Sequence, residues 1–295
     1  MAKILVTGGS GFLGSHIADA LSDIGHEVTI LDLSNSKYLR DDQNFIQGDI
    51  TDQESMNKAL RGMDYVYHLA ALADLREAQE LPLESIHINI YGTAVLLNAA
   101  VKNNIKRFIF GSSVYVYSKQ GGFYRCSKQA CEAYLEQYHN KYGLNYTVLR
   151  YGSLYGPRTD STNGVYRLLQ NFKDKDSYEY VGSKTDKRDY IHVYDASKLS
   201  AQVLAPEYEN KHYVLTGNDK LEVGELFTMF SEILNKKVKI SYREGDNGAN
   251  GRYNITPYTY APSIGKKLVT NEFVDMGQGI IQLLEEMRVS TENNE

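Results

Sequence analysis

Residues 3–14 of the chain read KILVTGGSGFLG, an apolar run that passes directly into regularly spaced glycines. A short run that is continuously apolar is typical of a parallel strand buried on both faces. Gly8, Gly11 and Gly14 then open the following helix in a G-x-x-G-x-x-G pattern. Glycines at such a turn let backbone N–H groups approach a pyrophosphate and let the helix pack closely on the strand. The segment therefore predicts a strand, turn and helix that bind a dinucleotide.

The second predicted strand ends in an acidic residue, Asp32. A carboxylate at this place in a dinucleotide-binding unit accepts hydrogen bonds from the adenosine ribose and repels a 2′-phosphate. We therefore expect NAD rather than NADP as the cofactor. A glycine turn without any ligand is the alternative, and the order of strand, glycines, helix, strand and carboxylate argues against it.

Short apolar runs alternate with longer amphipathic stretches through about the first 150 residues. We expect strands at residues 3–7, 27–31, 44–47, 64–68, 106–110 and 145–150, and helices at residues 12–23, 53–61, 84–103 and 124–142. Right-handed crossovers between parallel strands place helices on both faces of the sheet. The predicted fold class is α/β, a Rossmann-type doubly wound parallel sheet with a smaller C-terminal lobe.

The alternation loosens beyond Gly156-Pro157, where the chain becomes polar and favours loops to about Tyr190. Residues 191–203 predict one more strand and helix, and residues 221–234 predict a clear helix. We therefore expect two domains. The dinucleotide-binding domain comprises residues 1–155 with about 191–217, and the second lobe comprises residues 156–190 and 218–295.

Composition and charge exclude several classes of protein. The net charge of −5 argues against a nucleic-acid platform, which would be basic. The only cysteines, Cys126 and Cys131, form neither a disulfide framework nor a zinc motif, so we expect no metal site. No apolar run is long enough to span a membrane, and the N-terminal run is too short for a signal peptide. We expect a soluble, cytoplasmic protein.

Two further motifs follow predicted strands at their carboxyl ends, where open α/β sheets bind ligands. They are Gly48-Asp49-Ile50 and His68-Leu69-Ala70-Ala71. Asp49 could contact the adenine amino group, or it could be the N-cap of the helix at residues 53–61. His68 is interpreted as a packed residue at a strand end, without a chemical role.

Chemistry on a hydroxyl beside a nicotinamide needs a base, and a Tyr with a Lys one helical turn later can supply it. The chain contains four Y-x-x-x-K pairs: Tyr115–Lys119, Tyr124–Lys128, Tyr180–Lys184 and Tyr194–Lys198. The first runs into two glycines, the third straddles a glycine in a polar segment, and the fourth has no hydroxyl-bearing strand end before it. Only Tyr124–Lys128 opens a long helix and follows hydroxyls, those of Ser112-Ser113, at a strand end. We therefore favour Tyr124 and Lys128.

These residues resemble the extended short-chain dehydrogenase/reductase family, in its NAD-dependent sugar epimerase/dehydratase branch. The resemblance covers residues 1 to about 217. It is carried, in the family's order, by residues 7–14 (TGGSGFLG), 48–50 (GDI), 68–71 (HLAA), 89–93 (NIYGT), 112–117 (SSVYVY), 124–128 (YRCSK), 150–158 (RYGSLYGPR) and 188–193 (RDYIHV).

The resemblance implies a role for each matching residue. Ser113, Tyr124 and Lys128 would form the catalytic triad, with Asn89 as a structural support near it. The implied NAD site comprises Gly8, Gly11, Phe12, Leu13, Gly14, Asp32, Asp49, Ile50, Leu69, Ala70, Ala71, Asn89, Tyr124, Lys128 and Tyr151. The implied nucleotide-sugar site comprises Ser113, Ser153, Tyr180, Arg188 and Arg243. For both arginines a surface salt bridge is the alternative, and only Arg188 lies in a family motif.

The chain also departs from the family pattern. Sugar 4,6-dehydratases of this branch carry Asp-Glu after the catalytic hydroxyl residue, whereas this chain has Val114-Tyr115. Elimination of water is therefore not expected. The stretch between Ser113 and Tyr124 is shorter than in typical members, and Ser153 stands where many epimerases have Asn. Residues 255–262 match no functional motif.

The resemblance predicts an NAD-dependent epimerase of nucleoside-diphosphate sugars, acting at sugar carbon 4 through a transient 4-keto sugar. A reductase or decarboxylase of the same class would share every residue named so far. A non-catalytic dinucleotide-binding sensor or scaffold is the rival from another class, although a sensor needs no base. The family also implies a homodimer formed through the helices at residues 84–103 and 124–142, and a setting in polysaccharide precursor synthesis.

Overall fold

The computed structural model describes residues 1–218, 220–243, 255–260 and 280–281. The chain divides into two compact units, and the first, Met1–Ala261, contains all the elements described below.

A parallel sheet of seven strands, counted over the described residues, forms the centre of this unit in the order β10-β6-β5-β4-β1-β2-β3. Its strands are β1 (Lys3–Thr7), β2 (Glu27–Asp32), β3 (Gln43–Gln47), β4 (Tyr65–His68), β5 (Arg107–Ser113), β6 (Tyr146–Tyr151) and β10 (Lys211–Leu215). The strand order reverses at β1, which lies between β2 and β4. Ligands of such sheets bind at this reversal, outside the carboxyl ends of the strands.

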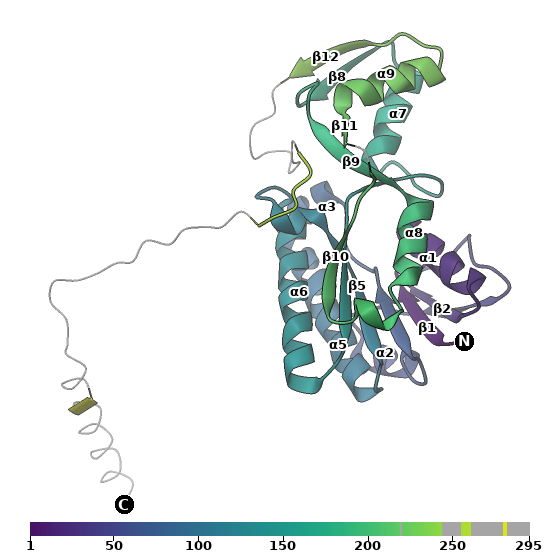
Figure 1. Cartoon of the computed structure of the whole chain (residues 1–295), viewed down its shortest axis with the longest axis vertical. Coiled ribbons are helices and arrows are strands. Elements are labelled where there is room, and N and C mark those ends of the chain that lie inside the picture. Colours follow the sequence, from purple (N-terminus) through teal and green to yellow (C-terminus); the bar gives the residue numbers. More distant parts are fainter. Residues whose placement is uncertain (219, 244–254, 261–279, 282–295) are drawn as a thin grey trace, which may run out of the picture. The chain divides into compact units, whose positions relative to one another are not determined.

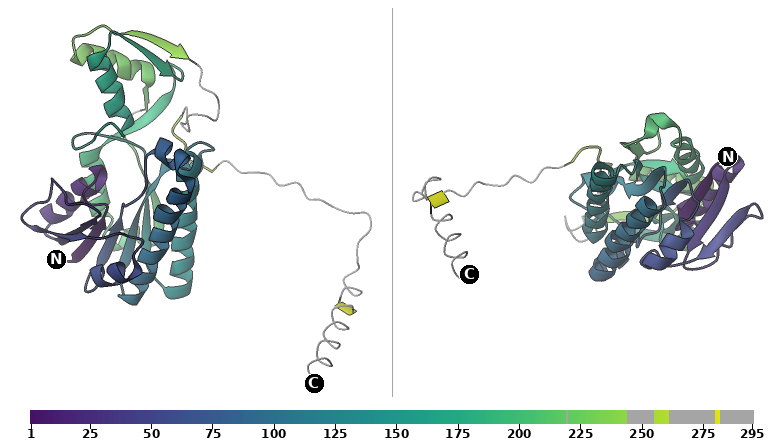
Figure 2. Two further views of the ribbon diagram at one scale, coloured as in Figure 1. Left: turned by 180° about the vertical axis from the view of Figure 1, so that it is seen from behind. Right: turned by 90° about the horizontal axis from the view of Figure 1, so that it is seen from below.

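Helices cover both faces of this sheet (Figure 1). One face packs against α1 (Phe12–Asp23) and α8 (Val193–Gln202). The other packs against α2 (Gln53–Ala59), α5 (Gly92–Lys102) and α6 (Gly122–Tyr142). The views from behind and from below in Figure 2 show the same layers. The predicted doubly wound Rossmann-type sheet is confirmed.

A smaller lobe lies beyond β6 and contains two further sheets. One pairs β7 (Ser153–Tyr155), β9 (Lys187–His192) and β11 (Lys220–Glu222), and the other pairs β8 (Ser177–Val181) with β12 (Lys239–Arg243). Its helices are α7 (Gly164–Asp174) and α9 (Val223–Ile233). Their apolar faces enclose a separate core around Phe172, Tyr180 and Phe227. The interpretation of residues 156–190 as loops was wrong, because only two residues of α7 are buried and its polar face dominates the sequence.

The helix expected at residues 84–103 is interrupted. A short α4 (Pro82–Glu84) leads into a π-helix, Ser85–Tyr91, and α5 begins only at Gly92. Another helix, α3 (Leu75–Glu80), begins at a stretch for which the sequence pattern predicted nothing, with Asp74 as its N-cap. π-turns are rare and concentrate at functional sites, and this one carries Asn89.

Candidate active site

The glycine turn after β1 is shaped by close backbone contacts. Gly8 has a φ of +71°, and a Cβ there would lie 2.6 Å from the backbone nitrogen of Ala70. A Cβ on Gly14 would lie 2.1 Å from the carbonyl oxygen of Gly8. Only glycine therefore fits either position. The first contact packs the turn against the loop that follows β4, and the second packs the start of α1 against the turn.

Helix α1 starts with free hydrogen-bonding capacity. Its N-cap is Gly11, which provides no side-chain cap, and its first turn contains no acidic residue. The N–H groups of Phe12 and Leu13 lie in the first turn, at the positive end of the helix dipole. This arrangement suits a pyrophosphate.

Asp32 lies at the tip of β2 beside this turn. Its carboxylate accepts hydrogen bonds from the backbone nitrogens of Ser10 at 3.0 Å and Leu33 at 2.8 Å. The remaining lone pairs can accept from a ribose, so the glycine turn and Asp32 together fit a dinucleotide.

The next two strand ends complete this edge of the sheet. Ile50 is buried against Gly92, whereas the exposed Asp49 accepts hydrogen bonds from the backbone and hydroxyl of Thr51. The N-cap of α2 is Asp52, so the alternative interpretation of Asp49 as that cap was wrong. Leu69, Ala70 and Ala71 follow β4 and are partly exposed.

His68 is a packed residue, as predicted. Its two ring nitrogens lie 2.7 Å from Thr7 Oγ1 and 2.9 Å from Thr93 Oγ1, and burial lowers its pKa to about 3. It therefore stays neutral at physiological pH.

The predicted catalytic residues lie together at the carboxyl end of β5. Tyr124 and Lys128 project from the first turns of α6, which begins after Gly121 in a left-handed conformation. A hydrogen bond joins the hydroxyls of Tyr124 and Ser113. The Lys128 ammonium lies 5.7 Å from the centre of the Tyr124 ring and donates to the Gly111 carbonyl at 2.8 Å.

Burial governs the ionisation of this cluster. It raises the pKa of Tyr124 to about 12, although the hydrogen bond with Ser113 acts in the opposite direction. It lowers the pKa of Lys128 to about 8. Burial is thus the largest influence on the pKa of Tyr124.

Asn89 ties the reacting helix to the loop after β4. Its side-chain amide donates to the Ser127 hydroxyl at 2.9 Å, and it both donates to and accepts from the backbone of Leu72. Ser127 in turn donates to the Tyr124 carbonyl at 2.8 Å. Asn89 is thus a buried support of α6.

Arg188 of β9 is buried and interacts electrostatically with Tyr115, two residues after Ser113. Its guanidinium donates to the Tyr180 hydroxyl, and the phenols of Tyr180, Tyr190 and Tyr115 raise its pKa although burial opposes this. The ring of Tyr180 packs against Phe227 in the core of the lobe. Tyr180 therefore supports Arg188 and offers no exposed ring face to a nucleotide base.

The remaining predicted site residues are placed less centrally. Arg243 is exposed and pairs with Glu179 at 3.1 Å, which matches its alternative interpretation as a surface salt bridge. The Tyr151 hydroxyl is buried beneath the sheet against Ser200, and only its carbonyl lies near the centre, 3.5 Å from Ser113 Oγ. Ser153 begins β7 and is partly exposed.

Sequence reasoning missed a buried ion pair behind the centre. Arg150 Nη2 lies 2.6 Å from Glu132 Oε2, and the Ser112 hydroxyl donates to Glu132 Oε1 at 2.6 Å. The position of Glu132, one turn after Lys128, was the available signal. We call Ser112, Glu132 and Arg150 the brace.

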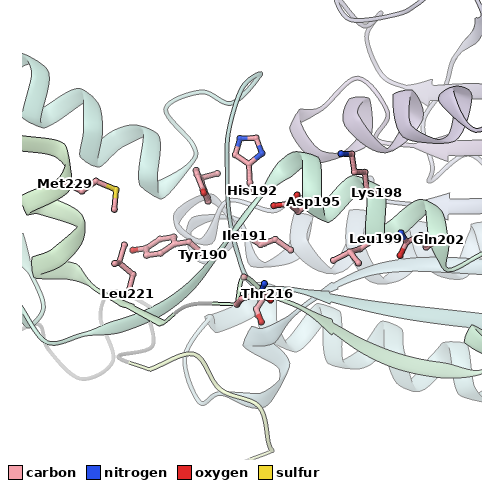
Figure 3. Close-up of a pocket in the computed structure, with 13 residues that line it drawn as sticks. Tyr190, Ile191, His192, Asp195, Lys198, Leu199, Gln202, Thr216, Leu221 and Met229 are labelled. Carbon is pink, nitrogen blue, oxygen red and sulfur yellow. The ribbon is translucent and has the colours of Figure 1, made fainter. Parts of the chain in front are cut away.

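A separate pocket of about 670 Å³ lies between α8 and the lobe (Figure 3). Tyr190 projects toward Leu221 and Met229 on the lobe side, and Asp195 and Lys198 come from α8. The residues that line it do not include the catalytic cluster or Arg188.

Among the residues that the structure describes, no group of acidic, His or Cys side chains could hold a metal ion. No helix of this part of the chain is long and apolar enough to span a membrane.

Known proteins resemble the chain over most of its length. Residues 4–216 match the model of the NAD-dependent epimerase/dehydratase family. A Methanocaldococcus jannaschii protein, named provisionally as a UDP-glucose 4-epimerase, is 30% identical over 82% of this chain and 87% of its own length.

Two solved structures share this architecture. UDP-glucose 4-epimerase of Thermotoga maritima, solved with UDP-glucose, is 30% identical and superposes with a TM-score of 0.78, covering 88% of this chain and 90% of that one. UDP-glucose 4-epimerase of Thermus thermophilus, solved with NAD, is 25% identical with a TM-score of 0.76, covering 90% and 95%.

Proposed function

The chain belongs to the NAD-dependent epimerase/dehydratase family, and on this premise we propose that it is a nucleoside-diphosphate-sugar 4-epimerase. It is an NAD-dependent enzyme of the extended short-chain dehydrogenase/reductase type, similar to UDP-glucose 4-epimerases. The observation that carries the proposal is the cluster of Ser113, Tyr124 and Lys128 beside the glycine turn.

The reaction needs a proton acceptor, an oxygen anchor and a hydride acceptor at one sugar carbon. NAD⁺, which the glycine turn, Asp32 and Lys128 would hold, would supply the hydride acceptor and a positive charge. Tyr124 takes the proton of the C4 hydroxyl and later returns it, while Ser113 holds the same oxygen. Lys128 would hold the cofactor's ribose, and its ammonium, 5.7 Å from the centre of the Tyr124 ring, favours the ionised phenol. The cofactor is regenerated within each cycle.

Arg188 supplies the other end of the substrate site. Its buried guanidinium lies near Tyr115, two residues after Ser113. A guanidinium suits the bidentate binding of a diphosphate. We therefore assign the diphosphate to Arg188 and the sugar ring to the space between Arg188 and Ser113. In this assignment residues 156–190 and 218–243 belong to the nucleotide-sugar lobe.

The residues after Ser113 distinguish epimerisation from dehydration. Val114 is buried and apolar, and Tyr115 carries a phenol near Arg188. Neither position offers the carboxyl group that could remove or deliver a proton next to the reacting carbon. The cluster therefore supports hydride exchange at one carbon and not elimination of water.

Proton NMR of the purified protein tests the proposal with a panel of UDP-, GDP-, CDP- and dTDP-sugars. NAD⁺ is present only in a catalytic amount. We expect one sugar to convert to its C4 isomer with no net formation of NADH. Turnover only with stoichiometric NADH or NADPH would instead indicate a reductase, release of CO₂ a decarboxylase, and silence under all conditions a sensor.

We propose that the chain forms a homodimer through the exposed surface of α4, the π-helix Ser85–Tyr91 and α6. Leu83 and Ile86 are exposed on α4 and the π-helix, and Tyr91 and Tyr134 are exposed on the π-helix and α6. Large apolar side chains gathered on neighbouring helices favour burial in an interface. We further propose a cytoplasmic setting and a role in polysaccharide precursor synthesis, because the product would be a glycosyl donor.

A further inference from the structure

Residues 255–260 cross from the small lobe to the catalytic helix, and we call them the strap. Ile255 forms a parallel bridge with Lys187 at the start of β9. Alternate residues then carry hydroxyls. Those of Thr256 and Tyr258 bond to Asp189 on β9, and that of Tyr260 bonds to Arg150 on β6.

The first part of the strap holds Asp189, the neighbour of Arg188. The backbone nitrogen of Asp189 donates to Thr256 Oγ1 at 3.0 Å, and the Tyr258 hydroxyl donates to Asp189 Oδ2 at 2.9 Å. Asp189 is 2% exposed and Thr256 3% exposed. Because both its backbone and its carboxylate are fixed, the strap determines where this part of β9, including Arg188, lies.

The far end of the strap holds the brace. The Tyr260 hydroxyl lies 3.1 Å from Arg150 Nη2 and 3.4 Å from Glu132 Oε2. Its ring packs edge-on against Tyr117, whose ring also stacks on the Arg150 guanidinium. Tyr260 therefore contacts both charges of a buried ion pair.

Each member of the brace is adjacent to the reacting centre. Ser112 precedes Ser113 on β5, and Glu132 follows Lys128 by one turn of α6. Arg150 connects this pair to β6. A shift of the brace would move the catalytic hydroxyl and ammonium with it.

We propose that Tyr258 and Tyr260 are positioning residues, which set the two halves of the nucleotide-sugar site relative to each other. Tyr258 acts through Asp189 on the Arg188 subsite, and Tyr260 acts through the brace on the catalytic cluster. The inference rests on the proposed function, because a nucleoside-diphosphate sugar must be gripped at its diphosphate while its C4 hydroxyl meets Tyr124. A misplacement of about 1 Å between such points can reduce turnover about a hundredfold.

The test compares Tyr258→Phe with Tyr260→Phe, which each remove one hydroxyl and keep the ring. Loss of a hydrogen bond to a charged group predicts effects of about fivefold or more. We expect Tyr258→Phe to weaken UDP binding and raise KM with kcat unchanged. We expect Tyr260→Phe to lower kcat with UDP affinity unchanged. UDP binding is measured by titration calorimetry with saturating NAD⁺, and turnover by the NMR assay.

Tyr213→Phe is the matched control, since it also removes one hydroxyl, which bonds to the Glu207 carbonyl at 3.4 Å on β10. Thermal unfolding is recorded for all three variants. If the two tyrosines are merely structural, both variants will have a lower melting temperature, and Tyr258→Phe will not selectively raise KM nor Tyr260→Phe selectively lower kcat. That result would overturn the proposal. A wild-type protein that binds none of UDP, GDP, CDP and dTDP would overturn the proposed function together with this assignment. If the wild type binds and turns over its substrate and both variants keep the same KM and kcat, only the positioning role of Tyr258 and Tyr260 would be overturned.

Discussion

Tyr124 is a partly buried phenol whose pKa of about 12 makes it a weak acid until positive charge is placed beside it. Its neighbours nevertheless fix its direction, because Ser113 binds its hydroxyl and Asn89 anchors its helix through Ser127. The protein thus fixes the position of the Tyr124 side chain, whereas the protonation state of its hydroxyl depends on the positive charge that a bound cofactor would add.

Replacing Tyr124 by Phe removes the base and preserves the ring. We expect turnover to fall roughly 10²–10⁴-fold, the usual contribution of a general base, because a phenylalanine ring has no group that can accept the proton. NAD⁺ affinity, measured by calorimetry, should remain that of the wild type. Near-normal turnover in this variant would contradict the catalytic assignment.

His68 predicts a dependence of stability on pH. Its pKa is about 3 in the folded protein, whereas an unfolded His titrates near 6.5. Below pH 6.5 the unfolded chain binds a proton that the folded chain refuses, so the contribution of His68 to stability is lost as the pH falls toward 3.

Urea unfolding at pH 7 and pH 5 measures this effect by comparing the wild type with His68→Gln. The wild type should lose about 1.4 kcal/mol per pH unit more than the variant below pH 6.5. Parallel losses in the two proteins would show that His68 is not the acid-sensitive group.

At the scale of single residues, local sequence context allowed a choice of catalytic residues, and the structure places the chosen side chains near one another. Tyr124 and Lys128 could be chosen from four pairs because only theirs follows a hydroxyl-bearing strand end and opens a long helix. The brace and the support of Arg188 by Tyr180 could not be predicted, because their partners come from segments far apart in the sequence.

Among the elements, β1 and α1 matched their predicted bounds because apolar runs and glycines mark both ends. The π-helix could not be anticipated, since its widened turn has no signature distinct from an ordinary helix. Helix α7 did have signals, an N-cap at Asn163 and apolar residues at helical spacing, but polar composition concealed them.

Gly14→Ala tests the turn between β1 and α1. The new Cβ would overlap the Gly8 carbonyl oxygen at 2.1 Å. Because backbone cannot yield as a flexible side chain does, we expect a loss of about 1–3 kcal/mol in stability and at least about tenfold weaker NAD⁺ binding.

Gly164→Ala is the control for that variant, since a Cβ there meets nothing within 4 Å. Calorimetry with NAD⁺ and thermal unfolding decide the outcome. Equal affinities in the two variants would refute a cofactor role for the turn.

For the whole molecule, the doubly wound sheet follows from alternating patterns that need no long-range information. The arrangement of the lobe does not, because β7, β9 and β11 are short and pair with partners distant in sequence. The expected second lobe also includes residues 219, 244–254, 261–279 and 282–295, which lie outside the described residues.

Association is the remaining property of the whole molecule. Light scattering at micromolar concentration should give about twice the chain mass of 33.3 kDa. Leu83→Lys places a charge on the exposed helical face and should shift the mass toward the monomer without changing NAD⁺ affinity. A monomeric wild type would contradict the proposed homodimer.

The position of the strap near the end of the chain means that it is synthesised after the residues proposed to bind the cofactor. The glycine turn, Asp32 and the Tyr124–Lys128 pair leave the ribosome early, whereas Tyr260 follows on the order of ten seconds later at about 5–20 residues/s. The nascent chain can therefore acquire the parts that bind its cofactor before the residue that steadies its ion pair is made. We expect a chain interrupted before Ile255 to be loaded with NAD and yet poorly competent for turnover.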